Sequence, residues 1–463
     1  MDAFNENLNE QQAQQPMGCL HRFSKTIKVV IIGLLILLLM IPMFMIENLI
    51  SERGRTQEEA IDEVSEKWSL AQTITGPYLN LQYPVVTENN GEKKVSIKDL
   101  ILFPDELMVN GQLKTEILKR SIYEVNVYQS ELTLKGSFSS EELKKSRIDM
   151  DQLQFDRAAI CLNLTDMRGI SEQISITLGD SVYIFEPGMD NRGIDNTGVH
   201  AIANLSELKQ NKKLPYEIKI KLKGSQSLNF IPLGKTTRVD LKANWNTPSF
   251  TGNYLPNNRN ITEKEFSAQW QVLNLNRNYS QVMADYNTSN IKDIENSSFG
   301  VNFKIPVEQY QQSMRSAKYA ILIILLTFGV IFFTEIMNKT RIHALQYLLV
   351  GLALCLFYSL LLSFSEHVGF NPAYLLSSAL TIILVGGYMF GITKKKKPSL
   401  IMSGLLGILY LYIFVLIQLE TFALLAGSLG LFIILAMVMY FSKKIDWLSL
   451  IHISEPTRLR RIS

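Results

Sequence analysis

Side chains that could do chemistry are few and scattered in this chain. Five histidines and three cysteines occur in 463 residues, so neither a histidine-built metal site nor a disulfide framework is expected. The sequence contains no G-x-S-x-G, H-E-x-x-H, Walker-type or paired C-x-x-C motif, and nothing selects a serine–lysine dyad. We therefore predict no catalytic, cofactor-binding or metal-binding residues, no cofactor and no enzymatic activity.

Two reactive side chains occur in the long polar middle of the chain. Cys161 lies between Ile160 and Leu162, a pattern that favours a buried strand over redox chemistry. We interpret His200 as a structural residue.

A short acidic stretch in the same region could bind calcium. Asp190, Asp195 and Asn196 offer the oxygen ligands that calcium prefers. The glycine-rich turn over 188–198 explains the same residues equally well, so we predict no metal site there.

Charged side chains within apolar segments would indicate a pump, a carrier or a membrane enzyme, because burying one costs ~2.5–3.5 kcal/mol on insertion scales. Glu335 lies at the end of one apolar segment, and Glu366 and His367 lie in a short loop. Cys355 lies in the middle of a segment, where we expect it to pack. Proton-coupled transport is therefore disfavoured, whereas a path for a neutral substrate stays open.

Six apolar segments must position these residues. The mean hydropathy of +0.09 is an average over two unlike parts, apolar segments and one long polar stretch. Each apolar segment is close to the ~20 residues that span a bilayer. The first exceeds the ~7–15 apolar residues of a signal peptide, so we expect an uncleaved anchor. The predicted spans are 27–46, 319–334, 344–363, 372–392, 400–417 and 421–441.

Basic residues indicate the orientation of these spans. Lys and Arg precede the first span, lie between the second and third and between the fourth and fifth, and follow the sixth, whereas the opposite short loops carry none. The positive-inside rule then places both termini in the cytoplasm and the long polar segment in the periplasm. We attribute the lysine clusters to topology rather than to lipid-headgroup recognition. The net charge of +3 is too small to argue for nucleic acid.

The long polar segment has the pattern of a β domain. Two-residue alternation dominates between about 117 and 305, as in 216–222 and 237–241. Such alternation is typical of antiparallel sheets with one buried face and favours a sandwich. A weak echo, Leu-Lys-Gly-Ser at 134–137 and again at 222–225, suggests duplication, although its spacing from the preceding Tyr-Glu differs between the copies.

The stretch 47–72 predicts a helix that Gly76-Pro77 would end, either a stalk or a helix packed on the sheet. The expected fold class is a membrane α-helical bundle of six transmembrane helices with a large extracytoplasmic all-β, sandwich-like domain inserted between helices 1 and 2. The expected domains are a cytoplasmic tail at 1–26, transmembrane helix 1 at 27–46, a periplasmic mainly-β domain with a helical stalk at 47–316, a five-helix transmembrane region at 317–441 and a cytoplasmic tail at 442–463.

Several blocks of sequence are characteristic of one family. They are Trp68 with Gln72 and Gly76-Pro77, 227–234 continuing through 245–256, Trp270 with 275–277, Lys318-Tyr319-Ala320, Arg341-Ile342-His343, 365–370 and Leu419-Glu420 with 423–428. Over 47–447 the chain resembles the CreD family of inner-membrane proteins of bacterial cell envelope integrity. One departure is Ala344, where the family usually has proline. Residues 448–463 fit no expected continuation, and we predict a foreign or disordered segment there.

The resemblance implies a protein made under a two-component system that responds to cell-wall stress, including β-lactams. It further implies a link to envelope integrity and to tolerance of certain colicins. It implies no known reaction, so no catalytic residue is carried over. Glu335, His343 and Glu366-His367 become candidates for interhelical or partner contacts.

Three functions fit these observations. The leading one is a non-enzymatic protein whose β domain binds an envelope component, either an envelope protein or a peptidoglycan-related partner. The second is a transporter or permease-like subunit, which needs a polar path or a partner ATPase. The third is a membrane enzyme acting on envelope precursors, which needs clustered acids or a dyad. Besides that component we expect the lipid bilayer as a partner and no nucleic acid, and the sequence leaves the oligomeric state open.

Overall fold

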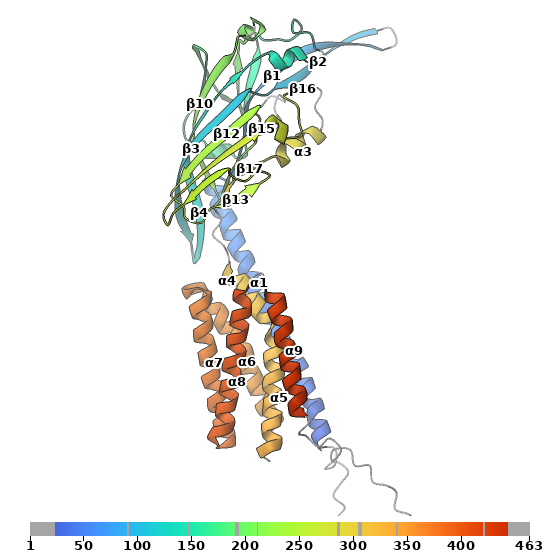
Figure 1. Ribbon diagram of the computed structural model, residues 1–463, viewed down its shortest axis with the longest axis vertical. Helices are drawn as coiled ribbons and strands as arrows, with labels where there is room; N and C mark the ends of the chain where they lie inside the picture. The colour runs from blue at the N-terminus through green and yellow to red at the C-terminus, as the bar shows by residue number, and fades with distance from the viewer. Residues whose placement is uncertain are drawn as a thin grey trace, which may run out of the picture. The chain divides into compact units, whose positions relative to one another are not determined.

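The structure is a computed structural model that describes residues 24–89, 92–145, 148–189, 194–210, 212–284, 288–303, 308–338, 341–419 and 422–442 (Figure 1). The chain divides into two compact units. The helical unit comprises Met1–Arg55 and Val307–Ser463, and the β domain comprises Thr56–Pro306. Helix α1 (Ser24–Trp68) begins in the first and ends in the second. The predicted foreign segment 448–463 lies outside the described residues.

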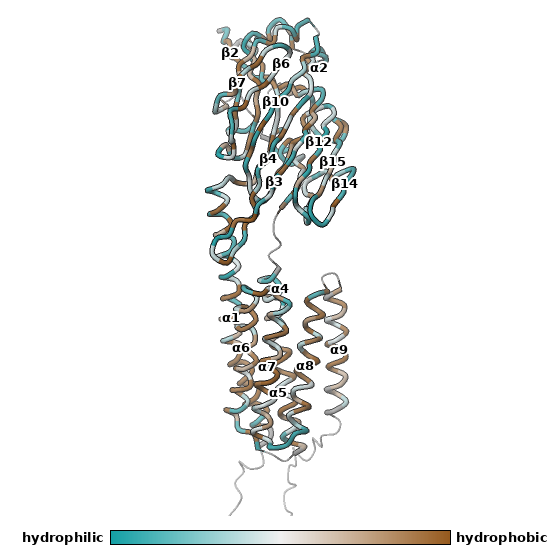
Figure 2. Tube along the Cα trace, turned by 90° about the vertical axis from the view of Figure 1, so that its left-hand side faces the viewer, coloured by the Kyte–Doolittle hydropathy of each residue, from teal (hydrophilic) through white to brown (hydrophobic). Residues whose placement is uncertain are grey.

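Long apolar helices build the helical unit. Among the described residues, five helices are long and apolar enough to cross a membrane, and they correspond to the first five of the six predicted spans. They are α1, α5 (Ala320–Asn338), α6 (Ala344–Val368), α7 (Phe370–Thr393) and α8 (Lys396–Gln418). The sixth predicted span forms α9 (Ala423–Ser442), whose described apolar stretch, Leu424–Met437, is shorter. Figure 2 shows mainly hydrophobic colours along α5 to α8.

Local chemistry sets the ends of these helices. The His343 side chain accepts a hydrogen bond from the Leu345 N–H, and the His343 N–H donates to Gln346 at 2.9 Å, which together form a capping box at the start of α6. Gly369 separates α6 from α7 with a φ of 78°, which glycine adopts without a Cβ penalty. A short amphipathic helix, α4 (Glu308–Lys318), packs against α6, α7 and α8.

Helix α1 ends earlier than the sequence predicts. It is continuous from the first span to Trp68, and Gly76-Pro77 lies within strand β1 (Gln72–Asn89), so the prediction that this pair ends the helix is wrong. Asp166 accounts for the difference, because its carboxylate accepts a hydrogen bond from the Leu70 N–H at 2.9 Å. A side chain distant in sequence therefore holds the chain just after the helix.

The described part of the β domain forms two sheets, which confirms the predicted β domain. The larger sheet has the order β13 (Ser249–Gly252), β17 (Phe299–Asn302), β11 (Ser227–Phe230), β1, β5 (Ala158–Leu164), β9 (Val199–Ala203) and β8 (Glu186–Pro187), with β2 (Glu92–Leu102) on β1 and β16 (Val282–Ala284) on β2. The other has the order β14 (Asn258–Ile261), β15 (Phe266–Leu273), β12 (Thr236–Ala243), β3 (Glu106–Arg120), β4 (Tyr123–Phe138), β10 (Leu214–Ser225), β6 (Ser175–Leu178) and β7 (Ser181–Ile184). Pairing is antiparallel except for β1 with β11 and β3 with β12.

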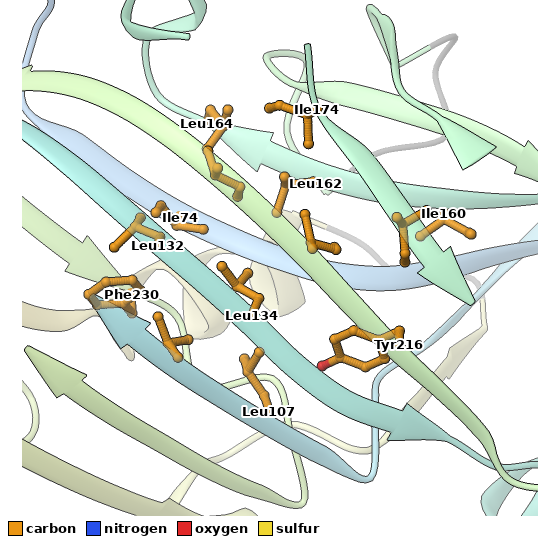
Figure 3. Close-up of a cluster of buried hydrophobic side chains, with 14 of the residues drawn as sticks. Ile74, Leu107, Leu132, Leu134, Ile160, Leu162, Leu164, Ile174, Tyr216 and Phe230 are labelled. Atoms are coloured by element: carbon orange, nitrogen blue, oxygen red, sulfur yellow. The ribbon is translucent and has the colours of Figure 1, made fainter. Parts of the chain in front are cut away.

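One hydrophobic core lies between the two sheets. Side chains of the larger sheet, such as Ile74 and Leu162, meet side chains of the other, such as Leu107 and Leu134 (Figure 3). Strands β3, β10 and β12 alternate between buried and exposed residues along much of their lengths, as strands with one buried face do. The two-residue alternation in the sequence therefore marks the strands of this sheet, which has one face in the core and the other exposed to solvent.

Strand β5 is buried on both faces, and this explains its continuous apolar sequence. Ile160 and Leu162 face the shared core, whereas Ala159 and Cys161 face a second cluster. That second cluster includes Ile294 of helix α3 (Thr288–Asn296), which covers this side of the larger sheet. Strand β1 is likewise not visible as an alternating pattern in the sequence, because its residues from Tyr78 to Leu81 are all buried.

Candidate functional site

A cavity of about 220 Å³ lies in the β domain beside β1. At this point the pairing of β1 with β5 shifts register, between Thr75 and Tyr78. The loop before β9 and the end of α3 complete the walls. We call this the β1–β5 cavity, and its lining residues are Thr73, Thr75, Asn163, Leu164, Thr165, Ile194, Asp195, Ile231, Ile294, Glu295 and Ser298.

Asn163 organises one wall of the β1–β5 cavity. Its Oδ1 accepts a hydrogen bond from the Tyr78 hydroxyl at 2.6 Å. Its Nδ2 donates to the backbone oxygens of Asp195 at 2.9 Å and Thr197 at 2.7 Å. The Tyr78 hydroxyl in turn accepts from the Ile194 N–H at 2.7 Å. These bonds hold the loop carrying Asp195 against the sheet, so this wall is preformed.

The lining of the cavity suits binding better than catalysis. It offers three threonine hydroxyls, one serine hydroxyl, one amide and two carboxylates, beside three isoleucines that are at most 5 % exposed. A hydroxyl nucleophile needs an adjacent base. No His, Lys or Cys is among the described lining residues. Polar groups gathered in a concave site can fix the orientation of a small ligand.

The cavity was not predicted from the sequence, although its lining residue Asp195 was considered as a calcium ligand. The lining comes from β1, β5 and α3, which lie far apart in the sequence. One signal was available, because Asn163 is an amide within the apolar run Ala158–Leu164 and is only 3 % exposed. A buried polar side chain in an apolar strand requires partners.

The suggested calcium ligands behave as turn residues where the structure describes them. The Asp195 carboxylate accepts hydrogen bonds from the Asn196 N–H at 2.6 Å and the Thr197 hydroxyl at 3.2 Å. Asp190 lies outside the described residues. Over the described residues, no group of three or more His, Cys, Asp or Glu could hold a metal ion.

His200 and Cys161 both take part in packing. His200 lies on β9 with its Nδ1 2.6 Å from the Gly188 backbone oxygen. Cys161 is fully buried in β5 within the second cluster, beside Tyr78 and Phe103. Both agree with the structural roles that the sequence indicates.

The joint between α1 and the sheets explains one block of the resemblance. The Gln72 amide donates to the Ser69 hydroxyl and to the Asp166 backbone oxygen, both at 2.8 Å. The Trp68 indole donates to the Tyr128 backbone oxygen at 3.5 Å, and the Lys223 ammonium lies 4.9 Å from the Trp68 ring centroid. These residues therefore attach the end of α1 to the β domain.

Asp166 is the centre of this joint. It is 7 % exposed and accepts hydrogen bonds from the Arg168 side chain at 2.9 Å and from the Leu70 N–H. Burial by itself raises the pKa of Asp166, but the hydrogen bonds from Arg168 and Leu70 and the Arg168 charge bring this pKa below its ordinary value. The carboxylate is thus a charged, positioned anchor.

A second block of the resemblance is organised by Arg277. Its guanidinium lies 4.3 Å from the Tyr279 ring centroid and donates to the Leu233 backbone oxygen at 3.1 Å and to Gln281. Gln281 also donates to the Pro104 backbone oxygen at 2.6 Å. These contacts join the segments 227–234 and 275–281, so both serve the architecture of the β domain.

In the helical unit, Glu335 makes interhelical contacts. It forms an ion pair with Lys28 of α1 and accepts a hydrogen bond from the Tyr347 hydroxyl of α6 at 3.2 Å. Lys28 also donates to the Ile342 backbone oxygen at 2.6 Å. Among the described residues, the ion-pair partner of Glu335 is Lys28. Glu335 therefore ties α1, α5 and α6 together.

Glu366 makes a comparable contact near the other end of α6. It accepts a hydrogen bond from the Tyr310 hydroxyl of α4 at 3.0 Å and lies 3.9 Å from the Arg53 guanidinium of α1. His367 is exposed and contacts the Ser363 backbone oxygen of its own helix at 3.1 Å. Of the four candidates, Glu335 and Glu366 make interhelical contacts, His343 caps α6, and His367 contacts the backbone of its own helix.

Charged side chains within α5 to α8 lie only near the helix ends. They are Glu335, Glu366, Lys396 and Lys397, and α7 contains none. Cys355 is buried in α6 with its sulfur 4.0 Å from the Leu39 backbone oxygen of α1, which fits a packing role. The β domain lies in the sequence between α1 and these apolar helices. This arrangement defines a multi-pass membrane protein with a globular β insertion.

Comparisons with known proteins narrow this class. The model of the family described as "Inner membrane protein CreD" matches residues 24–448. The inner membrane protein CreD of Escherichia coli (strain K12) is 32 % identical over 419 residues, which cover 89 % of this chain and 91 % of the relative. The chain belongs to the CreD family.

Proposed function

We propose that this protein supports cell envelope integrity during envelope stress, including tolerance of β-lactams and colicins, by binding an envelope component through its β domain. One observation carries the proposal, namely the β1–β5 cavity, which has a largely polar lining and a wall held in place by Asn163. The component is an envelope protein or a peptidoglycan-related molecule. The proposed role is non-enzymatic.

The proposal includes six spans, with both termini in the cytoplasm and the β domain in the periplasm. Supporting it are the basic residues near Lys394 and the apolar character of α9. Cysteine labelling in a Cys19→Ser background tests the orientation, because the other native cysteines, Cys161 and Cys355, are buried. A membrane-impermeant maleimide should label Glu263→Cys in intact spheroplasts but Lys394→Cys only after permeabilisation. The reverse pattern would refute the orientation.

Complementation tests the role of the cavity. A deletion strain carrying the Glu295→Arg variant should stay as sensitive to β-lactams as the empty strain, because a long cation is placed at the cavity. The matched control is Glu263→Arg, an exposed acid in the β14–β15 turn that does not line the cavity, and it should restore resistance. If Glu295→Arg restored resistance at equal membrane abundance, the cavity would not carry the function.

A second candidate function, a transporter or permease-like subunit, is favoured by one observation in the helical unit. The hydroxyls of Thr327, Tyr358 and Ser377 are buried there, and the described residues give them no hydrogen-bond partner. Unpaired hydroxyls in an apolar bundle can line a path for a neutral polar solute. If Tyr358→Phe with Ser377→Ala abolished complementation while leaving abundance unchanged, the transporter function would be preferred. A membrane enzyme acting on envelope precursors remains an alternative that rests on the fold alone.

A further inference from the structure

A larger hollow lies on the solvent-facing side of the sheet that contains β3 and β4. It extends over β12, β15 and the segment that leads into β14, strands that lie side by side in Figure 2. We call it the β12–β15 groove. Its volume is about 550 Å³, which is within the ~300–1,000 Å³ of small-ligand sites. It shares no lining residue with the β1–β5 cavity, and the described chain is unbroken from 212 to 284, the stretch that contains its lining. A ligand here is therefore additional to the one proposed for the β1–β5 cavity.

Two asparagines of the groove have their acceptor atoms occupied and their donor atoms available. The Asn257 Oδ1 accepts a hydrogen bond from the Gln271 N–H at 2.7 Å, and the Asn276 Oδ1 accepts one from the Leu273 N–H at 3.1 Å. These bonds also establish which atom of each amide is the oxygen. No described residue accepts a hydrogen bond from either Nδ2 group. Each asparagine therefore offers N–H donors to a ligand that carries a carbonyl oxygen.

Hydrogen bonds to neighbouring segments hold both asparagines in place. The Asn257 N–H donates to the Gln269 backbone oxygen at 2.8 Å. The Trp270 indole donates to the Tyr254 backbone oxygen at 3.2 Å, and the Tyr254 hydroxyl donates to the Asn276 backbone oxygen at 2.7 Å. The segments 254–257 and 269–276 are therefore tied together, and the donors of the groove are preorganised.

Exposed leucines accompany these donors. Leu273 lines the groove and is 39 % exposed. Leu275, next to Asn276 in the sequence, is 88 % exposed, and Leu255, two residues before Asn257, is 67 % exposed. A carbonyl acceptor joined to a small apolar group can use an amide donor and a leucine together. An acetamido group has this composition.

The rest of the lining suits an uncharged ligand with hydroxyl groups. Its charged residues are Arg238 and Asp240, whose formal charges cancel. The five side-chain amides of the lining belong to Asn257, Asn258, Gln269, Gln271 and Asn276. Amides both donate and accept hydrogen bonds, as hydroxyl groups do.

An extended peptide fits this place less well. A peptide that adds a strand to a sheet needs free backbone groups at the sheet edge. At this edge of β15 the N–H groups of Gln271 and Leu273 are already bound by Asn257 and Asn276. Recognition therefore falls to the side chains of the groove.

We infer that the β12–β15 groove binds an uncharged oligosaccharide that carries N-acetyl groups. The acetamido oxygen accepts from the Nδ2 group of Asn257 or Asn276, and its methyl group lies against Leu273. The ring hydroxyls form hydrogen bonds with Asp240 and with the glutamine amides of β15.

Three matched probes test the class of ligand on the full-length protein, in a polyoxyethylene detergent that has no sugar head group. The N-acetylglucosamine tetramer carries the acetamido groups, cellotetraose has hydroxyls in their place, and acetyl-tetraalanine amide represents a peptide. Titration calorimetry should show binding of the first and at least about tenfold weaker binding of the other two, the effect of one or two lost hydrogen bonds. Equal binding of cellotetraose would overturn the acetamido assignment. Equal or tighter binding of the peptide would overturn the sugar class, and no binding of the N-acetylglucosamine tetramer would refute the inference.

A further pair of probes identifies the source of the sugar. Wall glycan and lipid-borne glycans both contain N-acetyl sugars, but only wall glycan carries the lactyl group of muramic acid. The dimer of N-acetylglucosamine and N-acetylmuramic acid should bind as well as the N-acetylglucosamine dimer if the source is wall glycan. Binding at least about tenfold weaker would assign a lipid-borne glycan, and both results keep the sugar assignment.

Isosteric variants locate the binding. Asn257→Asp and Asn276→Asp each keep the oxygen that accepts from β15 but remove the Nδ2 donor, so each should weaken the N-acetylglucosamine tetramer about tenfold. The matched control is Asn204→Asp, because the exposed Asn204 also accepts a backbone hydrogen bond, from the Ser206 N–H at 3.0 Å, and lies outside the groove. It should leave binding unchanged. If both groove variants bind the tetramer as tightly as the unaltered protein, the inference fails, whereas the proposed function still depends on complementation by Glu295→Arg.

Discussion

Tyr128 lies directly across the β4–β10 ladder from Gly224, and its ring occupies the space where a side chain on Gly224 would stand. A Cβ added to Gly224 would lie 2.3 Å from the Tyr128 hydroxyl oxygen. The same arrangement occurs at the other end of the two strands, where Tyr216 pairs with Gly136 and a Cβ would lie 2.6 Å from the Tyr216 hydroxyl oxygen. Each of the two strands therefore places a tyrosine opposite a glycine of the other strand.

Glycine is required at both positions, but not equally. At Gly224 the nearest atoms belong to the Tyr128 side chain, whereas at Gly136 the nearest atom is the Glu106 backbone oxygen, 1.8 Å away. A side chain can move more easily than a paired strand. We expect Gly224→Ala to lower the free energy of unfolding by about 1–3 kcal/mol, the range for overpacking, and Gly136→Ala to lower it further.

Cysteine reactivity during heating measures this difference. Cys161 is buried in the β domain and becomes reactive only when that domain unfolds. A Cys19→Ser, Cys355→Ala background leaves it as the reporter. A smaller effect for Gly136→Ala than for Gly224→Ala would show that the β3–β4 contact yields more readily than the geometry indicates.

These contacts show which part of the β domain a sequence can predict. The Leu-Lys-Gly-Ser echo is visible in the sequence, but the preceding Tyr-Glu pairs, which begin at Tyr123 and Tyr216, lie at unequal intervals from the two copies. Measured from Tyr128 to Gly136 and from Tyr216 to Gly224, the interval is eight residues in both copies. Only the register of the β4–β10 ladder identifies Tyr128 as the counterpart of Tyr216. That register depends on pairing between strands about ninety residues apart. Local alternation predicts strands, but it does not predict which residues face each other.

Asp166 should control the acid stability of the α1 joint. Its pKa in the folded protein lies below the ordinary value of ~3.9. Its stabilising effect is therefore fully present above about pH 4 and is lost as the pH falls through the folded pKa. Asp166→Ala should lower the free energy of unfolding at pH 7 by roughly 2–3 kcal/mol, since it removes hydrogen bonds to a charged group.

The pH dependence separates this role from simple packing. The difference in stability between Asp166→Asn and the unaltered protein should shrink as the pH is lowered from 5 to 3, and the Cys161 reporter can follow it. The exposed Asp180 provides the control, because Asp180→Asn should have little effect at either pH. A difference that stays constant with pH would mean that the charge on Asp166 contributes nothing.

Glu335 and Lys28 should stabilise the helical unit as a pair. Their side chains are 14 % and 24 % exposed, between the exposed and the fully buried case. We expect Glu335→Ala to cost roughly 2 kcal/mol, between the ~0–1 kcal/mol of surface pairs and the ~3–5 kcal/mol of broken buried pairs. Cys355 is the reporter, in a Cys19→Ser, Cys161→Ala background. In a double-mutant cycle, Lys28→Ala should cost less once Glu335 is absent, because the ion pair is then already lost while the hydrogen bond from Lys28 to the Ile342 backbone oxygen remains. Fully additive losses would argue against the pair.

The membrane spans were predictable and this pair was not, for one physical reason. A span is recognised from about twenty neighbouring residues, because the bilayer acts on each segment separately. The pairing of Lys28 with Glu335 joins the first span to the second, and the whole β domain separates these two spans in the sequence. The β1–β5 cavity has the same character, since Thr73, Asn163 and Ile294 meet only through the fold. The sequence therefore predicts the elements, and the structure is needed to find the sites between them.

The hydrogen bond between Glu366 and Tyr310 should contribute more to the stability of the helical unit than the attraction between Glu366 and Arg53. The Tyr310 hydroxyl donates to Glu366 at 3.0 Å, and Tyr310 is only 4 % exposed. The Arg53 guanidinium lies 3.9 Å away, and its side chain is 48 % exposed, so solvent screens much of that attraction. Tyr310→Phe should therefore cost about 1 kcal/mol, Arg53→Ala less, and Glu366→Ala more than either.

Thermal unfolding followed through Cys355 ranks these three variants. Glu366→Gln is the informative addition, because its amide oxygen can still accept from Tyr310 while the attraction to Arg53 is lost. It should therefore behave like Arg53→Ala. A loss as large as that of Glu366→Ala would instead identify charge as the main contribution, and the attraction between Glu366 of α6 and Arg53 of α1 would then outweigh the hydrogen bond from Tyr310 of α4.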